Sequence, residues 1–188
     1  MKFIKSFLFF TLTLFSISAF ADIKLVSFSR EDQLTNLIKL LDHQDKVVEW
    51  VKSNTTNKAS TDNASDIVFH TFNTSISTGI DPTIILAIMR TESGFRTNAK
   101  SGYGAKGLMQ VVPRFHKDKL KGESPFNIQT SIRVGTQVLA DCLRKHKGST
   151  YKALNCYSGG GGSKYYRTVS GFKSNLDNFL KSKIRSIT

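Results

Sequence analysis

The chain has 188 residues, 39% of them hydrophobic and 22% charged, which suffices for one packed domain with additional segments. Its 27 lysine and arginine residues outnumber 14 acidic ones, so a net charge of +13 creates a field that attracts polyanions. No basic run is interleaved with aromatic residues and no nucleic-acid recognition motif is present, so nucleic acid is not an expected partner.

The N-terminal segment has the order of an export signal. Lys2 and Lys5 precede an apolar run over residues 7–15, and residues 19–21 read Ala-Phe-Ala, an A-x-A cleavage site. The apolar run is shorter than the ~20 residues that span a bilayer. We therefore expect a signal peptide over 1–21, a periplasmic or secreted mature protein, and no stable membrane span after cleavage. An uncleaved membrane tether is the alternative.

Residues 22–63 are expected to form an N-terminal helical arm and a polar linker. From Glu31 to about Val51 the apolar residues fall near one helical stripe. Residues 53–63 are polar and have no apolar periodicity, which indicates a linker. The arm is therefore expected to be an accessory and not part of the core that follows.

A second helical region begins at Ala64. Gly79 is expected to end its first helix, and Asp81-Pro82 to begin another that runs to about Ser93, because Asp caps a helix and Pro fits its first turn. Strand signals are weak everywhere, so the class is mainly α, with one domain over 64–172. Its further expected elements are a loop over 94–107, helices from Asn127 to about Lys147 and from Thr150 to Cys156, and a basic amphipathic C-terminal helix over 173–188.

Glu92 is the first candidate for chemistry. Ile88 and Met89 lie one turn before it, so Glu92 continues an apolar stripe at the helix end. A carboxyl group among apolar neighbours loses solvation, and it can stay protonated as a general acid must. The alternative is an ordinary glutamate at a helix end that points into solvent, and this feature alone does not favour catalysis over it.

Residues 102–107 match the G-x-G-x-x-G pattern of dinucleotide sites. That interpretation needs a strand before the glycines and a helix opening within them, and neither is indicated. We reject it; the glycines more simply allow sharp turns and close backbone approach.

Five ordered blocks over residues 64–172 resemble the soluble lytic transglycosylase family. The blocks are GIDP at 79–82; ESGF at 92–95 with AKS at 99–101 and GAKGLMQV at 104–111; Asn127 with Gly135 and Leu139; ALNCYSGG at 153–160; and YYR at 165–167 with Val169. The resemblance implies a goose-lysozyme-like α-helical catalytic domain. It departs from the family pattern at Ser158, where the family usually has asparagine.

The resemblance also implies roles for individual residues. Glu92 would be the catalytic acid/base, and Tyr157 would direct its hydroxyl toward Glu92 and the substrate. The expected substrate-binding residues are Ser101, Met109, Gln110 and Ser158. Met109 could equally be a core residue, and Ser101 could simply brace its loop.

The implied reaction cleaves the bond between N-acetylmuramic acid and N-acetylglucosamine in peptidoglycan and leaves a 1,6-anhydromuramoyl product. It uses one carboxylate where ordinary glycosidases use two, and it needs no metal or organic cofactor. The alternatives are a hydrolytic muramidase on the same scaffold and a non-catalytic wall-binding assembly protein.

The expected partner is the peptidoglycan glycan strand. Small exported members of the family also serve envelope-spanning secretion, conjugation or pilus machines, while others serve wall turnover or phages. One short domain without a wall-binding repeat favours the first group.

Cys142 and Cys156 are the only cysteines. In an exported chain they can form a disulfide, and two buried free thiols are the alternative. No nearby His or Cys completes a zinc site with them.

Overall fold

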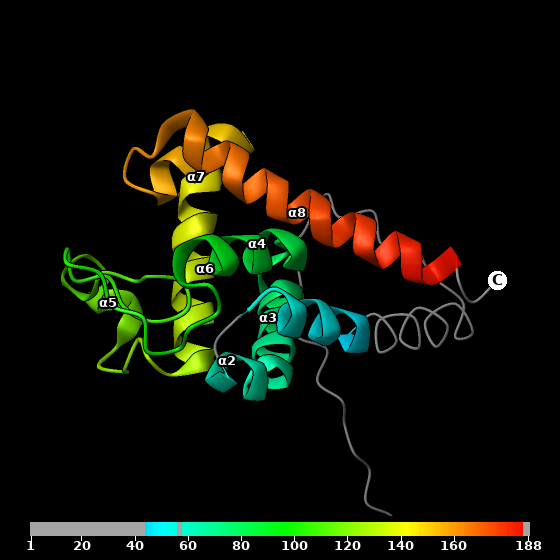
Figure 1. Ribbon diagram of the computed structural model, residues 1–188. Helices are drawn as coiled ribbons and strands as arrows, with labels where there is room; N and C mark the ends of the chain where they lie inside the picture. The colour runs from blue at the N-terminus through cyan, green and yellow to red at the C-terminus, as the bar shows by residue number, and fades with distance from the viewer. Residues whose placement is uncertain (1–43, 56–57, 186–188) are drawn as a thin grey trace, which may run out of the picture. The chain divides into compact units, whose positions relative to one another are not determined.

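Helices make up most of the computed structural model, which describes residues 44–55 and 58–185 (Figure 1). They comprise residues 44–53, α2 (Lys58–Asp62), α3 (Ala64–Thr78), α4 (Pro82–Ser93), the 3-10 turn η1 (Pro113–Phe115), α5 (Lys117–Leu120), α6 (Ile128–Lys145), α7 (Thr150–Tyr157) and α8 (Gly162–Arg185). The mainly α class is confirmed. The expected signal peptide over 1–21 and the arm up to residue 43 lie outside the described residues.

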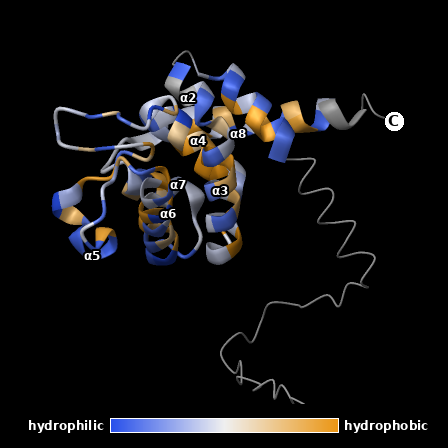
Figure 2. Ribbon diagram, turned by 90° about the horizontal axis from the view of Figure 1, so that it is seen from below, coloured by the Kyte–Doolittle hydropathy of each residue, from blue (hydrophilic) through white to orange (hydrophobic). Residues whose placement is uncertain are grey.

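The central element of the core is α4. The Asp81 carboxylate caps its start, since Oδ1 accepts hydrogen bonds from the backbone N–H of Thr83 at 2.9 Å and from its hydroxyl at 2.7 Å. Every residue from Ile84 to Met89 is buried, because α3 and α8 pack against this helix. A helix that is apolar on all sides belongs in a core, and α4 is correspondingly coloured as hydrophobic in Figure 2. Gly94, with φ of 59°, ends it.

The remaining long helices frame α4. Helix α8 runs along α4 and contacts α7, while α6 packs against α3 and α7 (Figure 1). Gly79, with φ of 69°, ends α3, and Asn127 Oδ1 accepts a 2.9 Å hydrogen bond from the Thr130 N–H at the start of α6. These boundaries are those expected from the sequence. No helix within the described ranges combines the length and apolar character needed to cross a bilayer.

The helix at residues 44–53 corrects the expectation of an accessory arm. Val47, Trp50 and Val51 are buried in the same apolar cluster as α4. Trp50 donates its indole N–H to Asn175 Oδ1 of α8 at 2.8 Å. A polar linker can cross the surface while the apolar helices on both sides of it pack into one core. This helix is therefore part of the domain.

Two further boundaries differ from expectation. The polar stretch over 53–63 was expected to lack helix, but α2 forms within it. The C-terminal helix was expected to begin at 173, but α8 is continuous from Gly162. Lys173 Nζ lies 3.1 Å from Asp81 Oδ2 and 2.9 Å from Asp177 Oδ2, and Leu176 is fully buried. Helix α8 therefore still packs against the domain beyond residue 173.

Close packing between α6 and the loop before α5 requires a glycine. A Cβ atom added to Gly135 would lie 2.5 Å from Met109 Cβ and 2.6 Å from its sulfur, and Met109 is buried. Gly107, with φ of 75°, is equally constrained, because a Cβ there would overlap the Pro125 carbonyl. The loop that carries Met109 therefore lies directly on α6.

We expect Gly135→Ala to destabilise the fold by about 1–3 kcal/mol, because the added methyl group overpacks the contact with Met109. Gly171→Ala is the matched control: Gly171 lies inside α8 with open space around its Cβ position. That variant should gain about 0.5–1 kcal/mol. Urea unfolding followed by circular dichroism measures both, and equal stability of the two variants would contradict the packing argument.

Candidate active site

Glu92 faces a cavity of about 630 Å³. The cavity lies between the end of α4, the loop that follows it, α6 and the end of α7. It brings together all six residues that the sequence analysis singled out for the site: Glu92, Ser101, Met109, Gln110, Tyr157 and Ser158. Residues separated by up to 66 positions in the chain thus line one cleft.

The carboxyl group of Glu92 is partly buried and has one specific partner. Tyr165 of α8 donates its hydroxyl to Glu92 Oε1 at 2.6 Å. Burial is the larger influence and raises the pKa of Glu92 above its ordinary value, while the hydrogen bond from Tyr165 favours the carboxylate and limits the rise. A carboxyl group in this balance can give a proton and later take one. The loss of solvation expected for Glu92 is consistent with this partial burial.

The hydroxyl group of Tyr157 has a different hydrogen-bond partner from the one expected. Its hydroxyl donates to the Met109 backbone carbonyl at 2.7 Å, and the donor to Glu92 is Tyr165. Tyr157 thus lies near Glu92 but donates to a backbone carbonyl, and its expected role toward the glutamate and the substrate stays a prediction. Tyr165 lay in one of the blocks that resemble the family, but nothing local distinguished it from Tyr166.

Both phenols are uncharged donors. Burial, and then the charge of Glu92, raises the pKa of Tyr157 well above its ordinary value. Burial is also the main cause that raises the pKa of Tyr165, with Tyr157 and Glu92 adding to it. Two neutral hydroxyl groups therefore lie near the carboxyl group of Glu92, and neither competes with it for ionisation near neutral pH.

The loop residues use their polar atoms mainly to hold the loop. Ser101 Oγ accepts a 3.0 Å hydrogen bond from the Ala105 N–H. Gln110 Nε2 donates to the carbonyls of Ala99 at 3.3 Å and Gly107 at 3.0 Å, and Gln110 has a positive φ of 47°. Bracing was the alternative left open for Ser101, and the geometry shows it. Contacts of these two side chains with a sugar stay a prediction.

Met109 serves the core and the cleft together. Its side chain is 1% exposed, packs on Gly135 and still lines the cavity. The two interpretations that the sequence left open for Met109 are thus compatible, because it lies at the boundary between the two regions.

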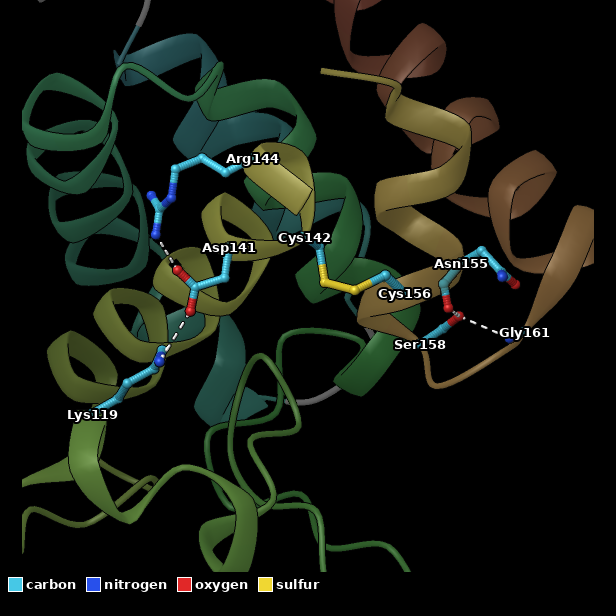
Figure 3. Close-up of a disulfide and its surroundings, with 8 residues drawn as sticks. All are labelled: Lys119, Asp141, Cys142, Arg144, Asn155, Cys156, Ser158 and Gly161. Atoms are coloured by element: carbon cyan, nitrogen blue, oxygen red, sulfur yellow. Dashed lines mark hydrogen bonds and ion pairs between the residues drawn. A yellow bond between two sulfur atoms is a disulfide. The ribbon is translucent and has the colours of Figure 1, made fainter. Parts of the chain in front are cut away.

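A disulfide fixes the other side of the cavity (Figure 3). Cys142 of α6 and Cys156 of α7 are bonded, with Cα atoms 5.9 Å apart, and both line the cavity. Ser158 Oγ donates to the Asn155 carbonyl at 3.1 Å and accepts from the Gly161 N–H at 2.9 Å. The bond ties α7 to α6 next to Tyr157, and Ser158 closes the turn that follows.

A second carboxylate, Asp141, also lines the cavity and was missed by the sequence analysis. Its Oδ2 lies 3.0 Å from Lys119 Nζ, and its Oδ1 pairs with Arg144 (Figure 3). Asp141 lies in α6 between the matched positions, so only the packing of α6 against α5 and α7 brings it to the cleft. Both of its oxygens are held by cations, whereas Glu92 faces a neutral phenol.

The transglycosylase SLT domain family model matches residues 71–177, which is more than half of the chain. The chain belongs to the transglycosylase SLT domain family. This membership confirms the resemblance seen in the sequence and the lysozyme-like class of the fold. The matched range contains every residue of the candidate site, including Tyr165 and Asp141.

Curated relatives of this SLT domain are longer proteins. The "Membrane-bound lytic murein transglycosylase C" of Yersinia enterocolitica is 34% identical over 121 residues, which cover 55% of this chain and 34% of the relative. The proteins of the same name from Yersinia pestis and Yersinia pseudotuberculosis are 37% identical over 102 residues, covering 45% of this chain and 28% of the relative. The chain thus spans about a third of the length of the relatives it matches.

We expect Tyr165→Phe to raise the pKa of Glu92 further, because it removes the hydrogen bond that favours the carboxylate and leaves the burial in place. Carbon-13 NMR of labelled glutamate carboxyl groups across a pH titration measures this directly. Tyr166→Phe is the matched control, since the Tyr166 ring packs 5.3 Å from that of Tyr151. A Glu92 titration that stays in place or moves to lower pH in Tyr165→Phe contradicts the assignment.

Proposed function

We propose that this protein is a lytic transglycosylase that cleaves peptidoglycan glycan strands, with Glu92 as its single acid/base. The observation that carries the proposal is a partly buried carboxyl group, its pKa raised by burial, that faces a cavity of about 630 Å³ and accepts a hydrogen bond from Tyr165. Membership of the SLT family and the names of the Yersinia relatives support the same reaction.

The proposed reaction has two proton transfers through one residue. Glu92 first protonates the oxygen of the bond between N-acetylmuramic acid and N-acetylglucosamine, and that bond breaks with its electrons on the leaving oxygen. The acetamido group of the muramoyl residue stabilises the cation at C1. The Glu92 carboxylate then takes the proton of the muramoyl C6 hydroxyl, whose oxygen bonds to C1 and closes a 1,6-anhydro ring. No water is consumed, so the enzyme is a lyase.

Each transfer requires a different protonation state of Glu92, and its surroundings suit both. Burial favours the protonated form that gives the first proton. The Tyr165 hydroxyl stabilises the carboxylate that forms afterwards, without supplying a charge that would prevent its reprotonation. Ser101, Met109, Gln110 and Ser158 form the walls in which the sugar lies.

A hydrolytic muramidase is the second candidate, because Asp141 shares the cavity with Glu92. A hydrolase would use a second carboxylate as nucleophile or as base for water. The pairing of Asp141 with Lys119 and Arg144 makes a structural role the better assignment.

We expect Glu92→Gln to lower the release of muropeptides by roughly 10²–10⁴-fold with the fold retained, since it removes the acid/base. Asp141→Asn should retain most of the activity. Mass spectrometry of the fragments released from purified peptidoglycan measures the activity of both variants and identifies the product.

The outcomes separate the candidates. Anhydromuramoyl ends that vanish in Glu92→Gln support the lyase. Reducing ends that vanish in both variants would make the protein a two-carboxylate hydrolase. A wild-type protein that binds the wall and releases nothing would favour the non-catalytic assembly role, and circular dichroism controls for folding.

We further propose that the protein acts outside the cytoplasmic membrane, in the periplasm or secreted. The export-signal pattern over residues 1–21 supports this site of action, and the relatives are named as membrane-bound murein enzymes. The net charge of +13 favours association with anionic envelope surfaces. The proposed partner beyond peptidoglycan is an envelope-spanning secretion, conjugation or pilus machine, for which an opening in the wall is needed.

Deletion of the gene should impair assembly of such a machine while growth and cell separation stay normal. Electron microscopy of the envelope beside growth curves measures this. A general growth or separation defect with intact machines would instead indicate wall turnover.

A further inference from the structure

Two exposed aromatic rings line the same cavity as Glu92. Tyr103 and Phe115 are 64% and 59% exposed, and their ring centroids lie 6.3 Å apart with a tilt of 39°. An exposed aromatic side chain that lines a cleft offers a large apolar face to a ligand. None of the interactions derived for the reaction at Glu92 uses them.

Arg114 lies against both rings. Its guanidinium carbon is 4.1 Å from the Tyr103 centroid and 4.7 Å from the Phe115 centroid, so cation–π contacts hold the three side chains together. In the described part of the chain no salt bridge involves Arg114. A guanidinium held by ring faces keeps its in-plane N–H donors for a ligand, and a carboxylate matches them best.

The backbone places this cluster firmly. Tyr103 lies in a turn closed by the Gly104 N–H on the Ser101 carbonyl at 3.0 Å, and Phe115 lies in η1. The two segments are joined by paired backbone hydrogen bonds of 2.9 and 3.0 Å between Lys106 and Val111. The rings are therefore mounted on a braced loop, as a binding surface requires.

The charge of this loop has one sign. Between Glu92 and Asp118 the sequence contains no acidic residue. The basic residues in that interval are Arg96, Lys100, Lys106, Arg114 and Lys117. A loop that carries charge of one sign attracts ligands of the opposite sign. Lys100 and Lys106 lie over the Phe126 ring, at 5.4 and 5.8 Å, so Arg114 is the cation that packs on the rings lining the cavity.

We propose that Tyr103, Arg114 and Phe115 form a subsite that stacks a sugar ring of the glycan strand and pairs Arg114 with a carboxylate attached to that strand. The proposal rests on the proposed function for its substrate. The N-acetylated sugar rings themselves are neutral, so the carboxylate belongs to the stem peptide or, in a stripped strand, to the lactyl group of the muramoyl residue. The subsite would thus select anionic, muramoyl-containing strands over neutral glycans.

The test is binding in the Glu92→Gln background, which prevents turnover. Isothermal titration calorimetry would use three soluble probes: peptide-bearing glycan fragments, the same fragments stripped by an amidase, and a neutral chitin hexamer. We expect Arg114→Gln to weaken binding of a carboxylate-bearing fragment about three- to fivefold and of the chitin hexamer less than about twofold. Arg114→Lys should recover part of the loss, since it keeps the charge without the planar donors.

Two further variants separate charge from shape. Phe115→Leu should weaken all three probes alike, because it removes the stacking face and leaves the charge. Lys181→Gln is the matched control, an exposed cation on α8, and should change none of them by more than about twofold.

The pattern of losses identifies the carboxylate. A loss confined to peptide-bearing fragments assigns it to the stem peptide, and a loss confined to stripped fragments assigns it to the lactyl group. An equal loss on the chitin hexamer, no loss on any probe, or no binding at all would overturn the subsite. Release of anhydro products without this selectivity overturns the subsite alone, and selectivity without products overturns only the proposed reaction.

Discussion

The whole site depends on a helix that is buried on every side until its last turn. From Ile84 to Met89, α4 has no solvent-facing residue, so α3 and α8 fix its rotation and its position along its own axis. Glu92 follows within the next turn, where the helix leaves the core. The direction of this one carboxyl group is therefore decided by the packing of apolar residues that take no part in the chemistry.

The turn that ends α4 has a strained backbone, and residues far away in the sequence stabilise it. Phe95 has φ of 65°, which is unfavourable for a residue with a side chain by about 1–2 kcal/mol. Its ring is fully buried and meets Trp50 edge to face at 6.0 Å, and burial of a large aromatic ring exceeds that strain. Thr55 adds a 3.2 Å hydrogen bond to the Gly94 carbonyl. The helix at 44–53 thus stabilises the end of the helix that carries Glu92.

The carboxyl groups of Glu92 and Asp141 both line the cavity, but their different surroundings give them different properties. Loss of solvation raises the pKa of Glu92, and the hydrogen bond from the neutral Tyr165 hydroxyl limits that rise. Among the residues that the structure describes, Asp141 forms ion pairs with two cations, Lys119 and Arg144, which Glu92 does not. The polar groups of the loop are similarly committed to the backbone. Tyr103 and Phe115, by contrast, keep their rings more than half exposed, with Arg114 packed against both.

The helical class, the cap at Asp81, the stop at Gly79 and the helix boundaries near Ser93 and Asn127 could be predicted from the sequence, because each depends on neighbours within one or two turns. Glu92 was singled out through the resemblance of its block to the family, because its local apolar stripe did not decide between a catalytic and a solvent-facing glutamate. The six residues named through blocks of family-like order line one cavity, and their roles stay predictions. Tertiary packing determines that Tyr165 and not Tyr157 donates a hydrogen bond to Glu92, that Asp141 lines the cleft, and that Trp50 belongs to the core. Those facts depend on the angle and register at which α8, α6 and the 44–53 helix pack. Helical periodicity gives the face that a residue occupies and says nothing about which distant residue will lie opposite it.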